Sequence, residues 1–213
     1  MMSSREEILG KLRQAKRPFP AVTPPTAHQK VVPLSDTSPV ALQARFVQEA
    51  EKAACVVHQA SSPAAAIAEI LQIVGEDMAV SSWDLAHIPV PGLPEALDKA
   101  NVSRVGLDAD VRVGITGVDA ALAATGSLVL MSGNGRFRAS SLLPPIHIAV
   151  LTAGQIVPDL ESWWAARKVS GLEQTRQHSN IAVITGPSRT ADIAMQLVMG
   201  MHGPRELHLV LLT

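Results

Sequence analysis

The residues with the clearest capacity for chemistry form the segment Gly-Pro-Ser-Arg-Thr at positions 186–190. A helix predicted to begin at Ala191 would present unpaired backbone N–H groups and the positive end of its dipole to an anion. Ser188 and Thr190 would add hydroxyl donors, and Arg189 can bind a carboxylate or phosphate through two hydrogen bonds. The segment therefore predicts an anion site. Its predicted ligand contacts are Gly186, Ser188, Arg189 and Thr190.

The same segment also fits a structural role. Either hydroxyl could cap the helix, while Arg189 could pair with Asp192 or Glu206. Asp192 in the first helical turn would satisfy the dipole and repel a ligand anion, yet it belongs to the same motif and stays a candidate site residue. Both interpretations remain open. A Walker loop is excluded because no Gly-Lys-Ser or Gly-Lys-Thr follows.

A second polar loop, Ser132–Ser141, lies between two apolar strands. Its two glycines permit backbone turns with positive φ, and its arginines and serines could converge on a negative charge. Because ligands usually bind at the carboxyl ends of parallel strands, we expect this loop and the 186–190 segment to face one ligand. The alternative is a solvated loop whose arginines contact water or surface acids. The candidate residues are Arg136, Arg138, Ser140 and Ser141.

Other polar residues admit two interpretations each. Asp119 could be a general base, although an acid at a predicted helix start is more often a cap. His202 lies where Gly203 and Pro204 must end a helix, so it could stabilise the helix dipole or take part in catalysis. No histidine pair has metal-ligand spacing, and the single cysteine, Cys55, is expected to be a small buried residue. We therefore predict no metal or cofactor in this chain.

The elements that must position these residues form an alternating pattern. Serine followed by proline, at Ser38 and Ser62, is typical of a helix start. Apolar strands that alternate with helices predict an α/β fold, an open and mostly parallel sheet with helices on both faces. We expect residues 1–37 to form an N-terminal helix and a proline-rich arm, and residues 38–213 to form the α/β domain. The predicted strands are 55–58, 78–80, 104–107, 127–131, 146–151, 181–185 and 207–212, and the predicted helices are 4–14, 39–51, 63–75, 118–124, 157–167 and 191–201.

Composition narrows the function. Hydrophobic residues make up 47% of the 213 residues and charged residues 17%, which excludes extensive disorder. Eighteen basic residues against nineteen acidic ones, 3% aromatic residues and no tyrosine argue against nucleic-acid binding. No apolar run approaches the roughly 20 residues that cross a bilayer. We expect a cytoplasmic protein without membrane insertion that binds a small anionic metabolite.

Five short motifs follow one another along the chain: Gly114-Ile-Thr-Gly, Ala-Thr125-Gly-Ser127, Ser141-Leu-Leu-Pro144-Pro-Ile-His147-Ile, Thr185-Gly-Pro-Ser-Arg-Thr-Ala-Asp-Ile193 and Gly200-Met-His-Gly-Pro204. Taken together, these motifs resemble the lactate-utilization protein C family, the LUD-domain group. The resemblance implies the NagB/RpiA/CoA-transferase-like fold and a part in oxidising L-lactate to pyruvate. It also implies an accessory role beside two partner proteins, iron–sulfur and oxidoreductase-like, with the iron–sulfur clusters on the partners.

One position departs from the family pattern. Family members usually carry Glu or Asp directly before the Thr-Gly or Ser-Gly pair, where this chain has Ala124. We therefore carry over no catalytic residue, and the matches at Ser141, His147, 186–192 and His202 are candidate ligand-binding residues only. The alternatives are a free-standing enzyme acting on a sugar phosphate, folate or CoA thioester, and a small-ligand sensor. A CoA transferase would need a carboxylate nucleophile, so Ala124 counts against that version.

Overall fold

The computed structural model describes residues 4–15, 31–106, 108, 110–191 and 197–213. The chain divides into two compact units, Met1–Lys30 and Val31–Thr213. In the first unit, helix α1 (Ser4–Gln14) has no buried residue. In the second unit, the side chain of Leu34 packs against the core. The second unit therefore includes a short segment ahead of residue 38, where the sequence favoured the boundary.

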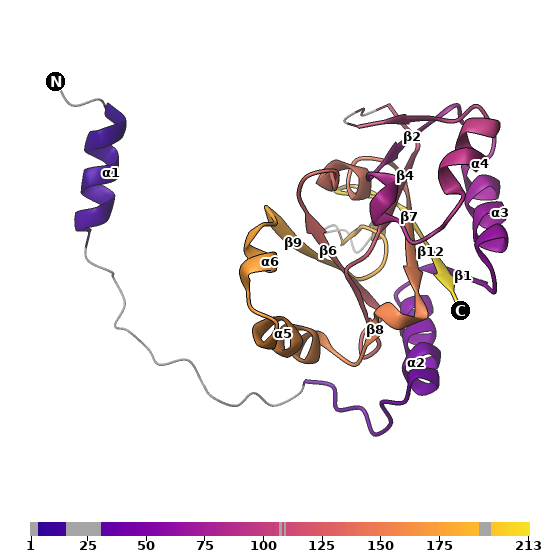
Figure 1. Ribbon diagram of the computed structural model, residues 1–213, viewed down its shortest axis with the longest axis horizontal. Helices are drawn as coiled ribbons and strands as arrows, with labels where there is room; N and C mark the ends of the chain where they lie inside the picture. Colours follow the sequence, from indigo (N-terminus) through magenta and orange to yellow (C-terminus); the bar gives the residue numbers. More distant parts are fainter. Residues whose placement is uncertain (1–3, 16–30, 107, 109, 192–196) are drawn as a thin grey trace. The chain divides into compact units, whose positions relative to one another are not determined.

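A six-stranded sheet, in the order β1-β12-β7-β4-β2-β3, forms the centre of the second unit (Figure 1). All of its strand pairs are parallel. Its central strands are almost wholly buried, as expected for a parallel sheet covered on both faces. The predicted open, mostly parallel α/β sheet is confirmed. The strands are β1 (Val56–Ala60), β2 (Ala79–Ser82), β3 (Ser103–Val105), β4 (Val113–Gly117), β7 (Ile146–Thr152) and β12 (Glu206–Leu212).

Helices α2 (Pro39–Lys52) and α3 (Pro63–Val74) begin where the sequence predicts them. Ser38 accepts a hydrogen bond from the backbone of Ala41 at the start of α2, and Ser62 caps α3 in the same way. Helix α3 lies over β1 and β12 and contacts α4 (Leu93–Lys99). No helix in the described part of the chain is long and apolar enough to cross a bilayer.

A second sheet, in the order β8-β5-β6-β9, lies with α2 on the other side of the parallel sheet. Along β6 the side chains alternate, so that Leu128 and Leu130 join the main core while Val129 and Met131 contact Trp163 of α5. The strands and helix are β5 (Ala120–Leu122), β6 (Ser127–Ser132), β8 (Ile156–Val157), β9 (Asn180–Ile184) and α5 (Leu160–Val169). The remaining elements are α6 (Glu173–Arg176), the strands β10 (Arg189–Ala191) and β11 (Leu197–Met199), and the short 3-10 helices η1 (Leu85–His87), η2 (Arg138–Ser141) and η3 (Ala153–Gln155).

The helix predicted at residues 118–124 is wrong. Residues 120–122 form β5, which pairs with β6 on one side and β8 on the other. Alanine favours helices when isolated, but all three residues of β5 are buried between sheet neighbours. Burial in the sheet therefore outweighs the weak helix propensity of the alanines.

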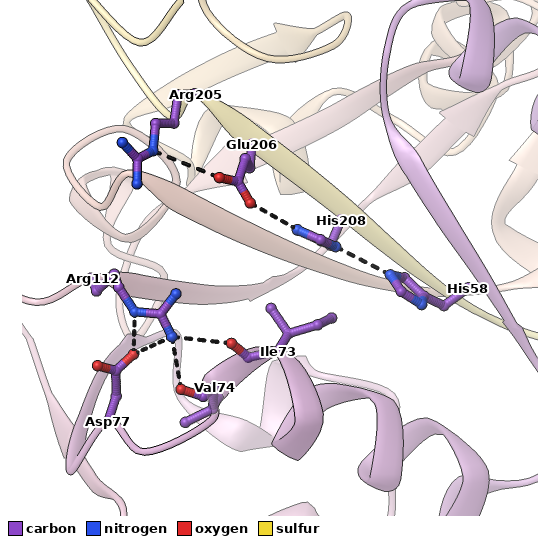
Figure 2. Close-up of polar contacts among 8 residues, drawn as sticks. All are labelled: His58, Ile73, Val74, Asp77, Arg112, Arg205, Glu206 and His208. Carbon is purple, nitrogen blue, oxygen red and sulfur yellow. Dashed lines mark hydrogen bonds and ion pairs between the residues drawn. The ribbon is translucent and has the colours of Figure 1, made fainter.

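Arg112 anchors the end of α3 to the sheet (Figure 2). Its Nη2 donates to the carbonyl oxygens of Ile73 and Val74, at 3.2 and 2.8 Å, and its Nε lies 2.6 Å from a carboxylate oxygen of Asp77. The last carbonyls of a helix have no partner within the helix. The guanidinium supplies donors for two of them.

A histidine pair joins α3 to the edge of the sheet. His58 Nδ1 lies 2.9 Å from a carboxylate oxygen of Glu69, and His58 Nε2 lies 3.1 Å from His208 Nδ1. Figure 2 shows that the series of polar contacts continues from His208 to Glu206 and from Glu206 to Arg205. Burial lowers the pKa of His208, and the hydrogen bond to Glu206 opposes that shift. The pair thus links β1, β12 and α3 on one face of the sheet.

Deletion of residues 1–30 is expected to leave a domain that melts cooperatively at the temperature of the full chain, because the two core clusters lie beyond residue 30. Deletion of residues 1–37 also removes Leu34, whose partial burial is worth about 1 kcal/mol. The longer deletion should therefore melt at a lower temperature in calorimetry. Equal melting temperatures for the two deletions would contradict the role given to Leu34.

Candidate functional site

Six residues predicted from the sequence line one cavity of about 300 Å³. The cavity lies at the amino ends of β7 and β12, and the loop between β9 and β10 forms part of its wall. The sequence analysis expected the ligand site at the carboxyl ends of the parallel strands, and for this cavity the expectation is wrong. The six residues are Ser141, His147, Gly186, Ser188, Arg189 and His202.

The helix predicted from Ala191 is wrong, because Arg189–Ala191 forms β10 and pairs antiparallel with β11. The backbone of Ser188 explains the difference: its N–H donates to Pro204 and its carbonyl accepts from Gly200. These long-range bonds direct the chain into a strand. The site therefore has no helix N-terminus at this point. Asp192 lies outside the described residues.

Gly186 allows the loop to approach α2 closely. It has φ of +76°, in the left-handed region that favours glycine, and an added Cβ would overlap the carbonyl oxygen of Ala53. Arg189 donates to the same carbonyl through Nη2. Both contacts fix the loop against the end of α2. No sequence signal near Ala53 pointed to this pairing.

Arg189 brings a positive charge to the lining of the cavity. Its side chain is exposed, and no carboxylate of the described residues forms an ion pair with it. Its neighbour Thr190 lies opposite Val198 on β11 and is not among the described residues that line the cavity. His202 lies at the rim, where its backbone N–H donates to the Ser188 hydroxyl at 3.3 Å. Arg189 is thus the cationic group of this wall.

His147 lies at the base of the cavity and is only 1% exposed. Its Nε2 is 2.8 Å from the hydroxyl oxygen of Thr116 on the adjacent strand β4. Burial lowers the pKa of His147 to about 3, so the ring is neutral at physiological pH. The cavity thus combines a neutral imidazole with the positive charge of Arg189.

The turn η2 packs against the sheet next to His147. An added Cβ at Gly114 would overlap the carbonyl oxygen of Ser140, so only glycine allows this approach. The Ser140 hydroxyl lies 3.0 Å from that of Ser81, which makes Ser140 a structural residue. Ser141 donates its hydroxyl to the Arg138 carbonyl at 3.0 Å and lines the cavity.

Arg136 is held away from the cavity by partners of its own. Its Nη1 lies 2.8 Å from a carboxylate oxygen of Asp119, and its guanidinium lies 5.3 Å from the Trp83 ring. Asp119 accepts a second hydrogen bond, at 2.7 Å, from the backbone of Met131. Asp119 therefore neither caps a helix nor faces the cavity. It connects the Arg136 loop to β6.

Arg136 and Arg138 line a different hollow of about 620 Å³, together with Gln177 and Asn180. Of the candidate residues in the 132–141 loop, Ser141 therefore lines the same cavity as the 186–190 segment, whereas the two arginines do not. A cleft of about 650 Å³ lies at the carboxyl ends of β2 and β3. We take the 300 Å³ cavity as the candidate site because it holds the buried His147 and Arg189, which forms no ion pair within the described ranges.

Sequence reasoning missed Thr116 as a site residue. Thr116 belongs to the Gly-Ile-Thr-Gly motif and is fully buried in β4. A hydroxyl within a wholly apolar central strand was the available signal, since a buried polar group requires a partner. Only the strand order shows that the partner is His147, because β4 and β7 are adjacent.

A profile of the LUD domain matches residues 43–212 of this sequence. The chain belongs to the LUD domain family. A DUF162 family protein from Deinococcus radiodurans has a similar fold, with a TM-score of 0.62 and 23% identity over 85% of this chain and 100% of that chain. This structure supports the fold alone.

Two curated relatives of this LUD domain carry the name lactate utilization protein C. The protein from Halalkalibacterium halodurans is 42% identical over 92 residues, which cover 43% of this chain and 40% of the relative. The protein from Geobacillus sp. (strain WCH70) is 40% identical over 120 residues, which cover 54% and 48%. Each match spans less than half of the relative's length.

Arg136→Ala is expected to destabilise the LUD domain by about 2–3 kcal/mol, because it leaves the nearly buried Asp119 carboxylate without its cation. Arg138→Ala is the matched control, since Arg138 is exposed and forms no ion pair within the described part of the chain. Urea denaturation of the two variants measures the difference. A stable Arg136→Ala variant would contradict the structural role of Arg136.

The depressed pKa of His147 predicts a loss of stability at low pH. Below about pH 6.5 the unfolded chain binds a proton at this residue, whereas the folded chain does not bind it until about pH 3. Stability should therefore fall by up to about 1.4 kcal/mol per pH unit from this group alone. Denaturation at a series of pH values between 7 and 4 gives the free energy of unfolding at each pH, and this free energy should fall less steeply with decreasing pH for His147→Asn than for the wild type. An equal pH dependence of the two proteins would show that His147 titrates normally in the folded protein.

Proposed function

We propose that this LUD domain is a cytoplasmic component of a lactate-utilization system and that its cavity binds a small anionic metabolite. The names of the two curated relatives support the lactate-utilization role. Because those matches cover less than half of each relative, the activity of the whole protein belongs to the proposal. The anion site rests on the geometry of the cavity in this chain.

The observation that carries the anion site is Arg189, which has no carboxylate partner among the described residues, on the wall of a cavity that also contains a buried, neutral His147. A carboxylate could bind the guanidinium through two charge-assisted hydrogen bonds. The imidazole and the Ser141 hydroxyl could then bind oxygens on the rest of the molecule. A volume of about 300 Å³ lies at the lower end of the range for small-molecule pockets and has room for lactate or pyruvate.

We assign electron transfer to partner proteins that carry iron–sulfur clusters and to an oxidoreductase-like partner. The single thiol, Cys55, is buried, and burial raises its pKa to about 11. A buried thiol with a raised pKa makes a poor metal ligand and a poor nucleophile, because both roles need the thiolate. An accessory role that binds the anion and presents it to a partner is consistent with these properties.

Arg189→Ala is expected to weaken anion binding about ten- to hundredfold, because a charge-assisted hydrogen bond contributes about 1.5–3 kcal/mol. The measurement is titration calorimetry with lactate, pyruvate and inorganic phosphate. Arg138→Ala is the matched control, because it removes an exposed arginine that is not among the described residues lining the cavity.

Melting temperatures recorded in parallel separate binding from folding. If none of the three anions binds the wild type, the anion site is refuted. The same conclusion follows if both arginine variants lose affinity equally, since the effect would then be that of net charge alone.

A further inference from the structure

The contact between Thr116 and His147 restricts where the imidazole proton can lie. Thr116 is fully buried, and within the described structure its hydroxyl has one hydrogen-bond partner, His147 Nε2 at 2.8 Å. The other ring nitrogen, Nδ1, has no partner among the described residues, although His147 is almost wholly buried and lines the cavity. A neutral imidazole has one N–H donor and one acceptor nitrogen.

Two arrangements of protons are possible, and they differ in cost. If Nε2 carries the proton, it donates to Thr116 and the threonine hydroxyl proton is left buried without an acceptor. If Thr116 donates to Nε2, lone pairs of the hydroxyl oxygen are left unused, and the remaining donor is Nδ1–H of the ring that lines the cavity, where water or a ligand oxygen can accept from it. Buried donors without a partner are rarer and more costly than acceptors with spare lone pairs. The second arrangement places the imidazole proton on Nδ1.

We propose that Thr116 fixes His147 in the Nδ1–H tautomer, so that the cavity presents an N–H donor to an oxygen of the bound anion. Because Nε2 is occupied by the Thr116 hydroxyl, His147 binds the ligand as a donor and does not remove a proton from it. His147 is thus a ligand-binding residue, and Thr116 is a positioning residue that acts through it. This inference about the ring proton deepens the proposed anion site and rests on it for the identity of the ligand.

The donor defines the class of ligand. With a carboxylate at Arg189 and an N–H at His147, the cavity suits a small carboxylate that carries an oxygen on the adjacent carbon. A 2-oxo acid accepts the hydrogen bond through its carbonyl oxygen. A 2-hydroxy acid accepts it and can donate in turn to the Ser141 oxygen, whose own proton is bound to the Arg138 carbonyl. A carboxylate without that second oxygen leaves the N–H unsatisfied.

The tautomer can be measured without any ligand by two-bond ¹H–¹⁵N correlation spectra of the histidine side chains. His147→Asn, which lacks the signal, assigns it among the seven histidines. The wild type is expected to show the proton on Nδ1, with the Nε2 shift of a hydrogen-bonded acceptor. Thr116→Ser keeps the hydroxyl and should preserve this spectrum. Thr116→Val keeps the shape and should move Nε2 toward the shift of an unbonded nitrogen.

A proton found on Nε2 in the wild type would overturn the inference. A Thr116→Val spectrum identical to that of the wild type would overturn the part assigned to Thr116. Neither result depends on a ligand, so both can be obtained even if the proposed anion site fails.

Calorimetry with pyruvate and propionate tests the class of ligand. The wild type should bind pyruvate about tenfold or more tightly than propionate, because propionate lacks the oxygen that accepts from Nδ1–H. His147→Gln places its amide near the Nε2 position and should lose this preference, whereas His147→Asn places an amide donor near Nδ1 and should keep part of it. Equal affinities of the wild type for pyruvate and propionate would overturn the ligand class. Absence of binding by either acid would refute the proposed anion site while the tautomer result stands.

Discussion

The site depends on one requirement: the neutral imidazole buried inside the parallel sheet needs hydrogen-bond partners. His147 lies among apolar side chains of β7, where a polar atom without a partner costs free energy. Thr116 on β4 meets that requirement at one nitrogen, and it can do so because the sheet order places β4 beside β7. The other nitrogen is left to the cavity. Burial keeps the ring neutral by lowering its pKa, and the strand order decides the direction in which the ring can bind.

The wall opposite His147 is built by contacts between distant parts of the chain. Ser188 pairs through its backbone with the turn that precedes β12, and Arg189 donates to the carbonyl of Ala53 at the end of α2. These contacts hold a cation at the cavity, and the part of the chain that the structure describes gives it no carboxylate partner. The cavity thus lies between loops at the amino ends of β7 and β12, and its position follows from loop packing and not from the crossover connections that usually place ligands in α/β folds.

The sequence predicted the fold more fully than the site, and the reason lies in the range of the interactions. Ser38 and Ser62, each followed by proline, predicted α2 and α3 because capping is local. The helices predicted at residues 118–124 and 191–201 were wrong because β5 also pairs with the distant strand β8, and because the long-range backbone bonds of Ser188 direct the following residues into β10. Both kinds of contact override local propensity.

The candidate site shows the same limit. The residue types selected Ser141 and Arg189, and the family resemblance added His147; all three line one cavity. The pairing of Arg136 with Asp119 could not be predicted, because those residues meet only once β5, β6 and the following loop are folded. Thr116 was missed for a related reason: a buried threonine has meaning only beside its neighbour on the next strand.

Gly114 and Gly186 allow backbone to touch backbone on two sides of the cavity. Because each meets a carbonyl oxygen of another segment, even alanine at either position must push two pieces of main chain apart. A random-mutagenesis screen scored only by loss of function would therefore recover these glycines together with the residues that bind the ligand. Measuring the amount of folded protein in each variant would separate the two groups, since a side chain at either glycine alters the packing that shapes the cavity.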